Sequence, residues 1–86
     1  MYEVIIPKRV EKWIDKHFNK ELQKRWYKRM QKLKIAPDAH GKPLRGKLAG
    51  RWEIRFEKRY RIIYRIDYQT KKVNIIGIKH KNELTK

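Results

Sequence analysis

The sequence predicts an α+β fold in which two N-terminal antiparallel helices pack on one face of a small, mainly antiparallel four-stranded sheet. Up to about residue 35, apolar residues recur with the period of an amphipathic helix. From residue 51 onward, apolar and polar residues alternate with the period of a half-buried strand. The expected order of elements is β-α-α-β-β-β, and 86 residues suit a single domain spanning residues 1–86.

The N-terminal half is predicted to hold a short strand and the two helices. A β-branched run at Tyr2–Ile6, closed by Pro7, favours an edge strand. The first helix is indicated by an apolar stripe at helical spacing: Val10, Trp13, Ile14, His17 and Phe18. Asn19 can end this helix and cap the next. The second helix, which should stop before Pro37, has its own stripe: Leu22, Trp26, Met30 and Leu33.

The C-terminal half is predicted to form a loop and three strands. Ala36–Lys42 contains Pro, Asp and Gly, which favours a loop. The strands are expected at Arg51–Glu57, Tyr60–Asp67 and Val73–Lys79. In the first two, aromatic and aliphatic side chains alternate with charged ones, mostly arginine; the third is apolar on both faces, which is typical of a central strand. We expect the helices to cover the aromatic face and the arginine-rich face to stay open.

The charge balance points to a polyanionic partner. Lys and Arg total 25 against 9 Asp and Glu, which gives a formal net charge of +16 at pH 7. Such a charge destabilises a compact chain by self-repulsion unless an anion lies against it, and nucleic acid phosphates are the usual partner. The surface of a heat-adapted protein would instead balance Lys with Glu.

Several other classes of protein are disfavoured by the composition. The chain has no Cys, which leaves no disulfide or thiol chemistry, and its three His have no ligand-like spacing for a metal cofactor. No signal peptide is evident, and no apolar run approaches the roughly 20 residues that span a bilayer. We therefore expect a soluble cytoplasmic protein without a cofactor, a membrane partner or a small-molecule ligand.

Three segments resemble the RelE/ParE toxin superfamily, most of all its RelE and YoeB branches. Pro43–Phe56 and Tyr60–Ile66 are similar to the "PL…L.G.W..R" and "(Y/H)RLVY" segments of those toxins, and Ile75–Lys81 is similar to the "I..I.HR" ending. The resemblance covers nearly the whole chain and implies the RelE-like fold and the toxin of a type II toxin–antitoxin pair. RelE and YoeB members are mRNA interferases that cleave mRNA in the ribosomal A site. ParE members share the fold, lack the nuclease residues and poison DNA gyrase.

The resemblance also implies a set of catalytic residues. Cleavage by attack of a 2′-OH on the adjacent phosphate needs a proton acceptor, a cation on the phosphate and a proton donor. Arg61 would grip the phosphate, His80 would transfer a proton, and Glu53 would act as the base or pair with a nearby arginine. The candidate catalytic set is Arg61, His80, Arg55, Lys81 and Glu53.

The other basic residues of the C-terminal half are expected to contact ribosomal RNA: Lys42, Arg45, Lys47, Arg51, Lys58, Arg59 and Arg65. Two positions depart from the family pattern. No aromatic residue follows His80-Lys81, and Lys42 replaces the acidic residue of YoeB-like members. Two alternatives to an endoribonuclease stay open: a ParE-like gyrase inhibitor, and a basic RNA-binding domain without catalysis. Both toxin hypotheses predict an acidic, RelB-like antitoxin partner, and the interferase also needs the ribosome and mRNA.

Overall fold

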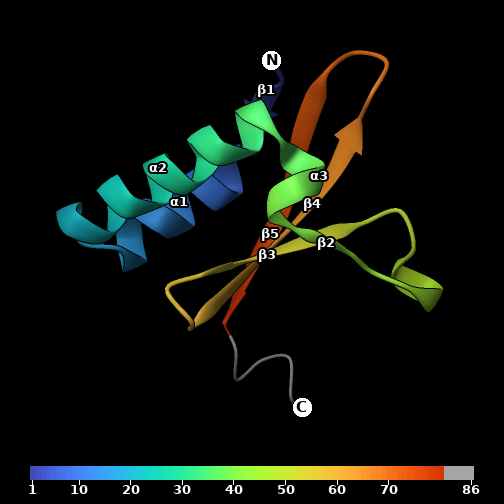
Figure 1. Ribbon diagram of the computed structural model, residues 1–86. Coiled ribbons are helices and arrows are strands. Elements are labelled where there is room, and N and C mark those ends of the chain that lie inside the picture. Colours follow the sequence, from blue (N-terminus) through green and yellow to red (C-terminus); the bar gives the residue numbers. More distant parts are fainter. Residues whose placement is uncertain (81–86) are drawn as a thin grey trace.

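In the computed structural model, which describes residues 1–80, two helices cover one face of a five-stranded sheet (Figure 1). The helices are α1 (Lys8–His17), α2 (Lys20–Ile35) and the short α3 (Pro37–His40). The strands are β1 (Glu3–Ile5), β2 (Lys42–Pro43), β3 (Trp52–Phe56), β4 (Tyr60–Asp67) and β5 (Lys72–His80). The predicted α+β class, the helix pair and the order of the four main strands are confirmed.

Within residues 1–80 the sheet has the order β1-β5-β4-β3-β2, and only the β1–β5 pair is parallel. β5 therefore lies inside the sheet, as its apolar sequence predicted. The fifth strand, β2, was not predicted; it is a two-residue edge strand paired with β3. The loop prediction for residues 36–42 was partly wrong, because the short helix α3 forms there. Pro37 lies in its first turn, where a backbone N–H has no partner within the helix, so the N–H that proline lacks is not needed.

The core lies between the helices and the aromatic face of the sheet. Asn19 caps α2, accepting a 2.9 Å hydrogen bond from the backbone N–H of Leu22. Buried residues of the two helices and of the turn between them meet buried strand residues in one cluster: Val10, Ile14, Phe18, Trp26, Met30 and Leu33 against Ile54, Phe56, Ile62, Tyr64, Val73 and Ile75. This confirms that the helices cover the apolar face, and it leaves the side chains of alternate strand residues on the other side.

A bulge in β5 changes which of its side chains face the helices. Opposite β4, Ile63 pairs with Gly77, but the next residue, Tyr64, pairs with Ile75. Ile76 is therefore an extra residue on β5, and the alternation of inward and outward side chains is reversed on its two sides. This reversal decides which residues at the end of β5 reach the open face of the sheet.

Buried contacts fix the connection between α3 and β2. The fully buried Tyr64 hydroxyl donates a 2.7 Å hydrogen bond to the carbonyl of Pro37. Burial, together with the negative charge of Asp38, raises the pKa of Tyr64, so the hydroxyl keeps its proton and remains a donor. A Cβ at Gly41 would collide with this hydroxyl and come within 2.9 Å of the Glu53 backbone oxygen. Only glycine fits here without displacing its neighbours.

We therefore expect Gly41→Ala to destabilise the protein by about 1–3 kcal/mol, the usual cost of overpacking a well-packed site. In a domain of this size each kcal/mol lowers the melting temperature by roughly 4–8 °C. Thermal unfolding followed by circular dichroism measures the change. Gly77→Ala is the matched control, because a Cβ there meets nothing within 4 Å. Equal melting temperatures for the two variants would contradict the tight packing at Gly41.

Candidate functional site

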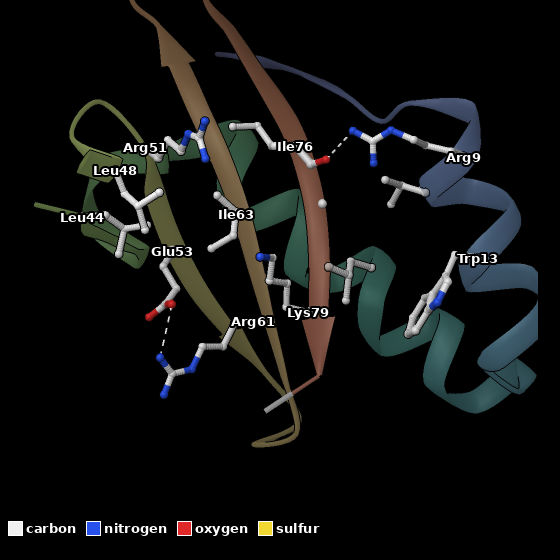
Figure 2. A pocket seen from close by; sticks show the side chains of 13 residues that line it. Arg9, Trp13, Leu44, Leu48, Arg51, Glu53, Arg61, Ile63, Ile76 and Lys79 are labelled. Carbon is white, nitrogen blue, oxygen red and sulfur yellow. Dashed lines mark hydrogen bonds and ion pairs between the residues drawn. The ribbon is translucent and has the colours of Figure 1, made fainter. Parts of the chain in front are cut away.

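The face of the sheet turned away from the core is hollowed into a cleft of about 690 Å³ (Figure 2). Its floor is formed by β3, β4 and β5. One wall is the segment after β2, with Leu44 and Leu48, and the other is α1, with Arg9 and Trp13. β1 pairs only with residues 72–74 of β5, so α1 lies beside the remaining edge, where the Arg9 guanidinium donates a 2.6 Å hydrogen bond to the carbonyl of Ile76.

Three cations form a row across the floor of the open face. Arg55 on β3 pairs in register with Arg61 on β4, and Arg61 pairs with Lys79 on β5. Like charges directly opposite one another on neighbouring strands repel and destabilise the sheet. An anion lying across the row would turn this repulsion into attraction, and a phosphodiester has the charge and the acceptor oxygens to do so.

Glu53 holds Arg61 in place from one strand away. Its side chain is only 6% exposed and its Oε1 lies 3.3 Å from a guanidinium nitrogen of Arg61, whose own side chain is 30% exposed (Figure 2). Of the two roles expected for Glu53, the structure shows the ion pair with an arginine. Because a buried carboxylate is costly without a partner, this pair restricts Arg61 to rotamers that face the cleft.

The open face is less uniformly cationic than the sequence predicted. Ile63, on the arginine-bearing side of β4, is 9% exposed and lies in the cleft with Leu44, Leu48 and Ile76. Alternation along β4 placed Ile63 correctly, but the segment at residues 44–48, which folds over this face, was not predicted. The cleft thus combines an apolar floor with a basic rim that includes Arg51.

The structure does not bring His80 to Arg61. His80 pairs in register with Tyr60, and the two rings meet edge to face with centroids 5.3 Å apart (interplanar angle 88°). Tyr60 belongs to the aromatic cluster under α1, so His80 faces the helix side of the sheet. Lys79 is the residue opposite Arg61 instead, and sequence reasoning did not select it. Lys81, the remaining catalytic candidate, lies outside the described residues.

The predicted RNA contacts are spread around the cleft rather than gathered in it. Arg51 lines the cleft, and Lys42 lines a smaller hollow at the β2–β3 edge together with Arg55. The others are exposed in the segment after β2, in the β3–β4 turn and on β4: Arg45, Lys47, Lys58, Arg59 and Arg65. Within residues 1–80, no helix is long and apolar enough to cross a membrane, and no three His, Asp or Glu side chains are grouped to hold a metal ion.

Sequence reasoning also missed Arg9, Leu44, Leu48 and Gly77 as cleft residues. A glycine inside an apolar strand often marks a place where another group approaches closely, so Gly77 could have been recognised from the sequence. The other three reach the cleft only through tertiary folding, and no local pattern marks them.

Comparisons with known proteins agree with the fold. Residues 6–85 match the model of a family described as the ParE toxin of the type II toxin–antitoxin system, parDE. A chain of the RelBE2 toxin–antitoxin complex from Mycobacterium tuberculosis is 30% identical, with a TM-score of 0.77 over 93% of this chain and 98% of that one. No curated protein sequence matches this chain.

Two further solved structures share the fold. A chain of the archaeal RelE–RelB complex from Pyrococcus horikoshii OT3 is 23% identical, with a TM-score of 0.74 over 93% of this chain and 94% of that one. The YoeB/ParE toxin from Agrobacterium tumefaciens is 16% identical, with a TM-score of 0.73 over 91% of this chain and 97% of that one. At these identities the likeness establishes the architecture alone.

Proposed function

This chain belongs to the ParE toxin family, within the RelE/ParE superfamily of type II toxins, and on that premise we propose that it is a ribosome-dependent mRNA interferase. The observation that supports this activity most directly is the row of Arg55, Arg61 and Lys79 on the open face of the sheet, with Arg61 and Lys79 lining the cleft and Arg61 held by the buried Glu53. A row of cations with one oriented guanidinium suits a phosphate that gains negative charge in a reaction.

The proposed reaction is attack of a message 2′-OH on its adjacent phosphorus. A bond forms between O2′ and phosphorus and the P–O5′ bond breaks. The 2′-hydroxyl proton passes to solvent water and the departing O5′ takes a proton from it, which gives a 2′,3′-cyclic phosphate and a 5′-OH. Arg61 would grip two phosphate oxygens, while Lys79 and Arg55 add positive charge on either side. Among residues 1–80 no histidine lines the cleft, so catalysis is proposed to rest mainly on positioning and electrostatic stabilisation.

The apolar floor gives the cleft a second function in this proposal. Ile63, Leu44 and Leu48 offer a surface against which a nucleobase can pack while its phosphate lies on Arg61. Holding the base fixes the sugar and its 2′-OH relative to the phosphorus. Holding the reacting groups in line in this way can supply a large part of an enzyme's rate enhancement.

The test is primer extension on a defined message in a purified translation system, with the protein added and ribosomes present or omitted. Cuts at A-site codons only in the presence of ribosomes are the expected result. An intact message in both lanes would refute the proposed nuclease activity.

Lys79 and His80, adjacent at the end of β5 but on opposite faces of the sheet, provide a test of which side chain acts in the reaction. We expect Lys79→Ala to lower the cleavage rate at least tenfold, because losing one group that stabilises developing charge costs about 10²–10³ in enzymes. His80→Phe keeps a ring against Tyr60 but removes the imidazole nitrogens, and it should cleave close to the unaltered rate. The rates are read from the same primer-extension assay. A large loss of cleavage rate in His80→Phe, with little loss in Lys79→Ala, would contradict this and would show that His80 is the residue that acts in the reaction.

We also propose an acidic antitoxin partner that covers part of the basic surface. A formal net charge of +16 and a cleft with an apolar floor suit a segment that carries both carboxylates and apolar side chains. Co-purification with the product of an adjacent short gene, and loss of growth inhibition when the two are expressed together, tests this partner.

A second candidate function, inhibition of DNA gyrase, is favoured by the description of the matching family as ParE toxins. A DNA supercoiling assay with purified gyrase discriminates the two functions, because an interferase should leave supercoiling unchanged.

A further inference from the structure

A second basic hollow, of about 390 Å³, lies at the β2–β3 edge of the sheet, beside the end of α3. Figure 1 shows where α3, β2 and β3 lie. Arg29 comes to it from α2, His40 from the end of α3, Lys42 from β2 and Arg55 from β3. Arg29 and His40 have no role in the proposed cleavage. Four nitrogen-bearing side chains from four separate elements thus converge on one hollow outside the cleft.

The cations of this hollow are not neutralised by the protein. Among residues 1–80, no ion pair or side-chain hydrogen bond involves Arg29, Lys42 or Arg55. Glu53 also borders the hollow, but its carboxylate is paired with Arg61 on the cleft side. Cations gathered without a counter-charge repel one another, and a bound anion removes that repulsion.

The hollow is rigidly built. α3 and β2 are joined at Gly41, which fits tightly between the Tyr64 hydroxyl and the backbone of Glu53, and Tyr64 ties α3 to the sheet through Pro37. Arg29 and Arg55 come from the interior of α2 and the end of β3. The charged groups are therefore presented by fixed backbone, which lowers the entropic cost of binding an anion.

We infer that Arg29, His40, Lys42 and Arg55 form a second phosphate-binding site, which takes a phosphodiester of RNA next to the one held at Arg61. Arg55 stands between the two sites, since it borders this hollow and pairs in register with Arg61. Two phosphate sites sharing one arginine can hold successive points of one RNA backbone, which fixes the register of the strand in the cleft. The inference rests on RNA being the ligand, as proposed above, but not on cleavage.

The test measures binding of a short single-stranded RNA with 2′-O-methyl groups, which cannot be cleaved, as a function of salt. Arg29→Ala is the sharpest variant, because Arg29 lies outside the cleft and alanine is a good helix former. Each lost phosphate contact should reduce the slope of log K against log salt by about 0.7 for a single strand. Arg25→Ala is the matched control: it removes the same charge one helical turn away, outside both hollows.

A smaller slope in Arg29→Ala than in Arg25→Ala supports the site, and partial recovery in Arg29→Lys strengthens it. The same measurement on vacant ribosomes separates the two sources of phosphate: an effect on the oligonucleotide assigns the site to the message, and an effect on ribosomes alone assigns it to ribosomal RNA. Identical slopes in both variants with both ligands would overturn the inference, as would an Arg29 effect confined to an acidic antitoxin. Because nothing is cleaved, absence of nuclease activity would leave this result intact.

Discussion

Arg61→Ala is expected to lower ribosome-dependent message cleavage by about 10²–10³-fold, the loss seen when one group that stabilises transition-state charge is removed. Arg61 occupies the middle of the cation row and is flanked by Arg55 and Lys79 in register. It is also the cation that Glu53 orients. Primer extension under single-turnover conditions, with ribosomes in excess, measures the rate.

Removing Arg61 has a structural cost that must be separated from its chemical effect. Arg61→Ala leaves Glu53, 6% exposed, as a buried carboxylate without its partner, and this can destabilise a protein by about 3–5 kcal/mol. The double variant Arg61→Ala, Glu53→Gln removes that stranded charge. Arg61→Lys keeps a positive charge near Glu53 but loses the planar two-pronged grip on phosphate. We expect both to stay folded, with the double variant inactive and Arg61→Lys intermediate.

Arg25→Ala is again the control of equal charge, since Arg25 lies on α2 and makes exposed or half-exposed pairs with Glu21 and Glu57. Such pairs contribute little to stability. It should cleave at nearly the unaltered rate. If the folded double variant cleaves as fast as Arg25→Ala, Arg61 has no part in the chemistry.

The main elements could be predicted from the sequence because their side chains are sorted by burial. Val10 and Ile14, continued by Phe18 just after the helix, mark the buried face of α1, and the alternation through Ile62 and Tyr64 marks that of β4. These periodicities follow from the geometry of helix and strand, so each can be recognised within its own segment. For the same reason the arginine side of β3 and β4 could be recognised.

The end of β5 shows where local pattern fails. Strict alternation from the buried Val73 and Ile75 would put His80 on the face of Arg61. The bulge at Ile76 inserts one residue and reverses this, so Lys79 lies opposite Arg61. The bulge is set by pairing with β4 across the sheet, and nothing in the apolar run of β5 alone reveals it.

The walls of the cleft and the second hollow were beyond prediction for a related reason. Leu44, Leu48 and Arg9 reach the cleft through the path of the chain between elements. His40 and Arg29 are brought together because the α3–β2 segment is anchored at Gly41. These positions depend on contacts between distant segments, whereas periodicity reports only the burial of one segment at a time.

Gly77→Phe is expected to abolish message cleavage without weakening the fold. Gly77 lies opposite Ile63 on the cleft floor, its φ is not in the left-handed region, and a Cβ there meets nothing within 4 Å. A phenyl ring would therefore fill the space proposed for the nucleobase, and aromatic residues are favourable in strands. Since displacement of a reacting group by about 1 Å can cost 10²-fold, we expect a loss at least that large.

The series Gly77→Ala, Gly77→Val and Gly77→Phe tests whether side-chain volume in the cleft is what blocks cleavage, because all three variants change the same position and differ in side-chain size. Cleavage should fall with side-chain size, while the melting temperature should not fall. Binding of the uncleavable RNA should keep the part of its salt dependence that comes from Arg29, because that hollow lies at the β2–β3 edge, away from β5. A Gly77→Phe protein that cuts message at the normal rate would show that the message does not enter this cleft, and a loss of activity in Arg61→Ala would then have to arise elsewhere.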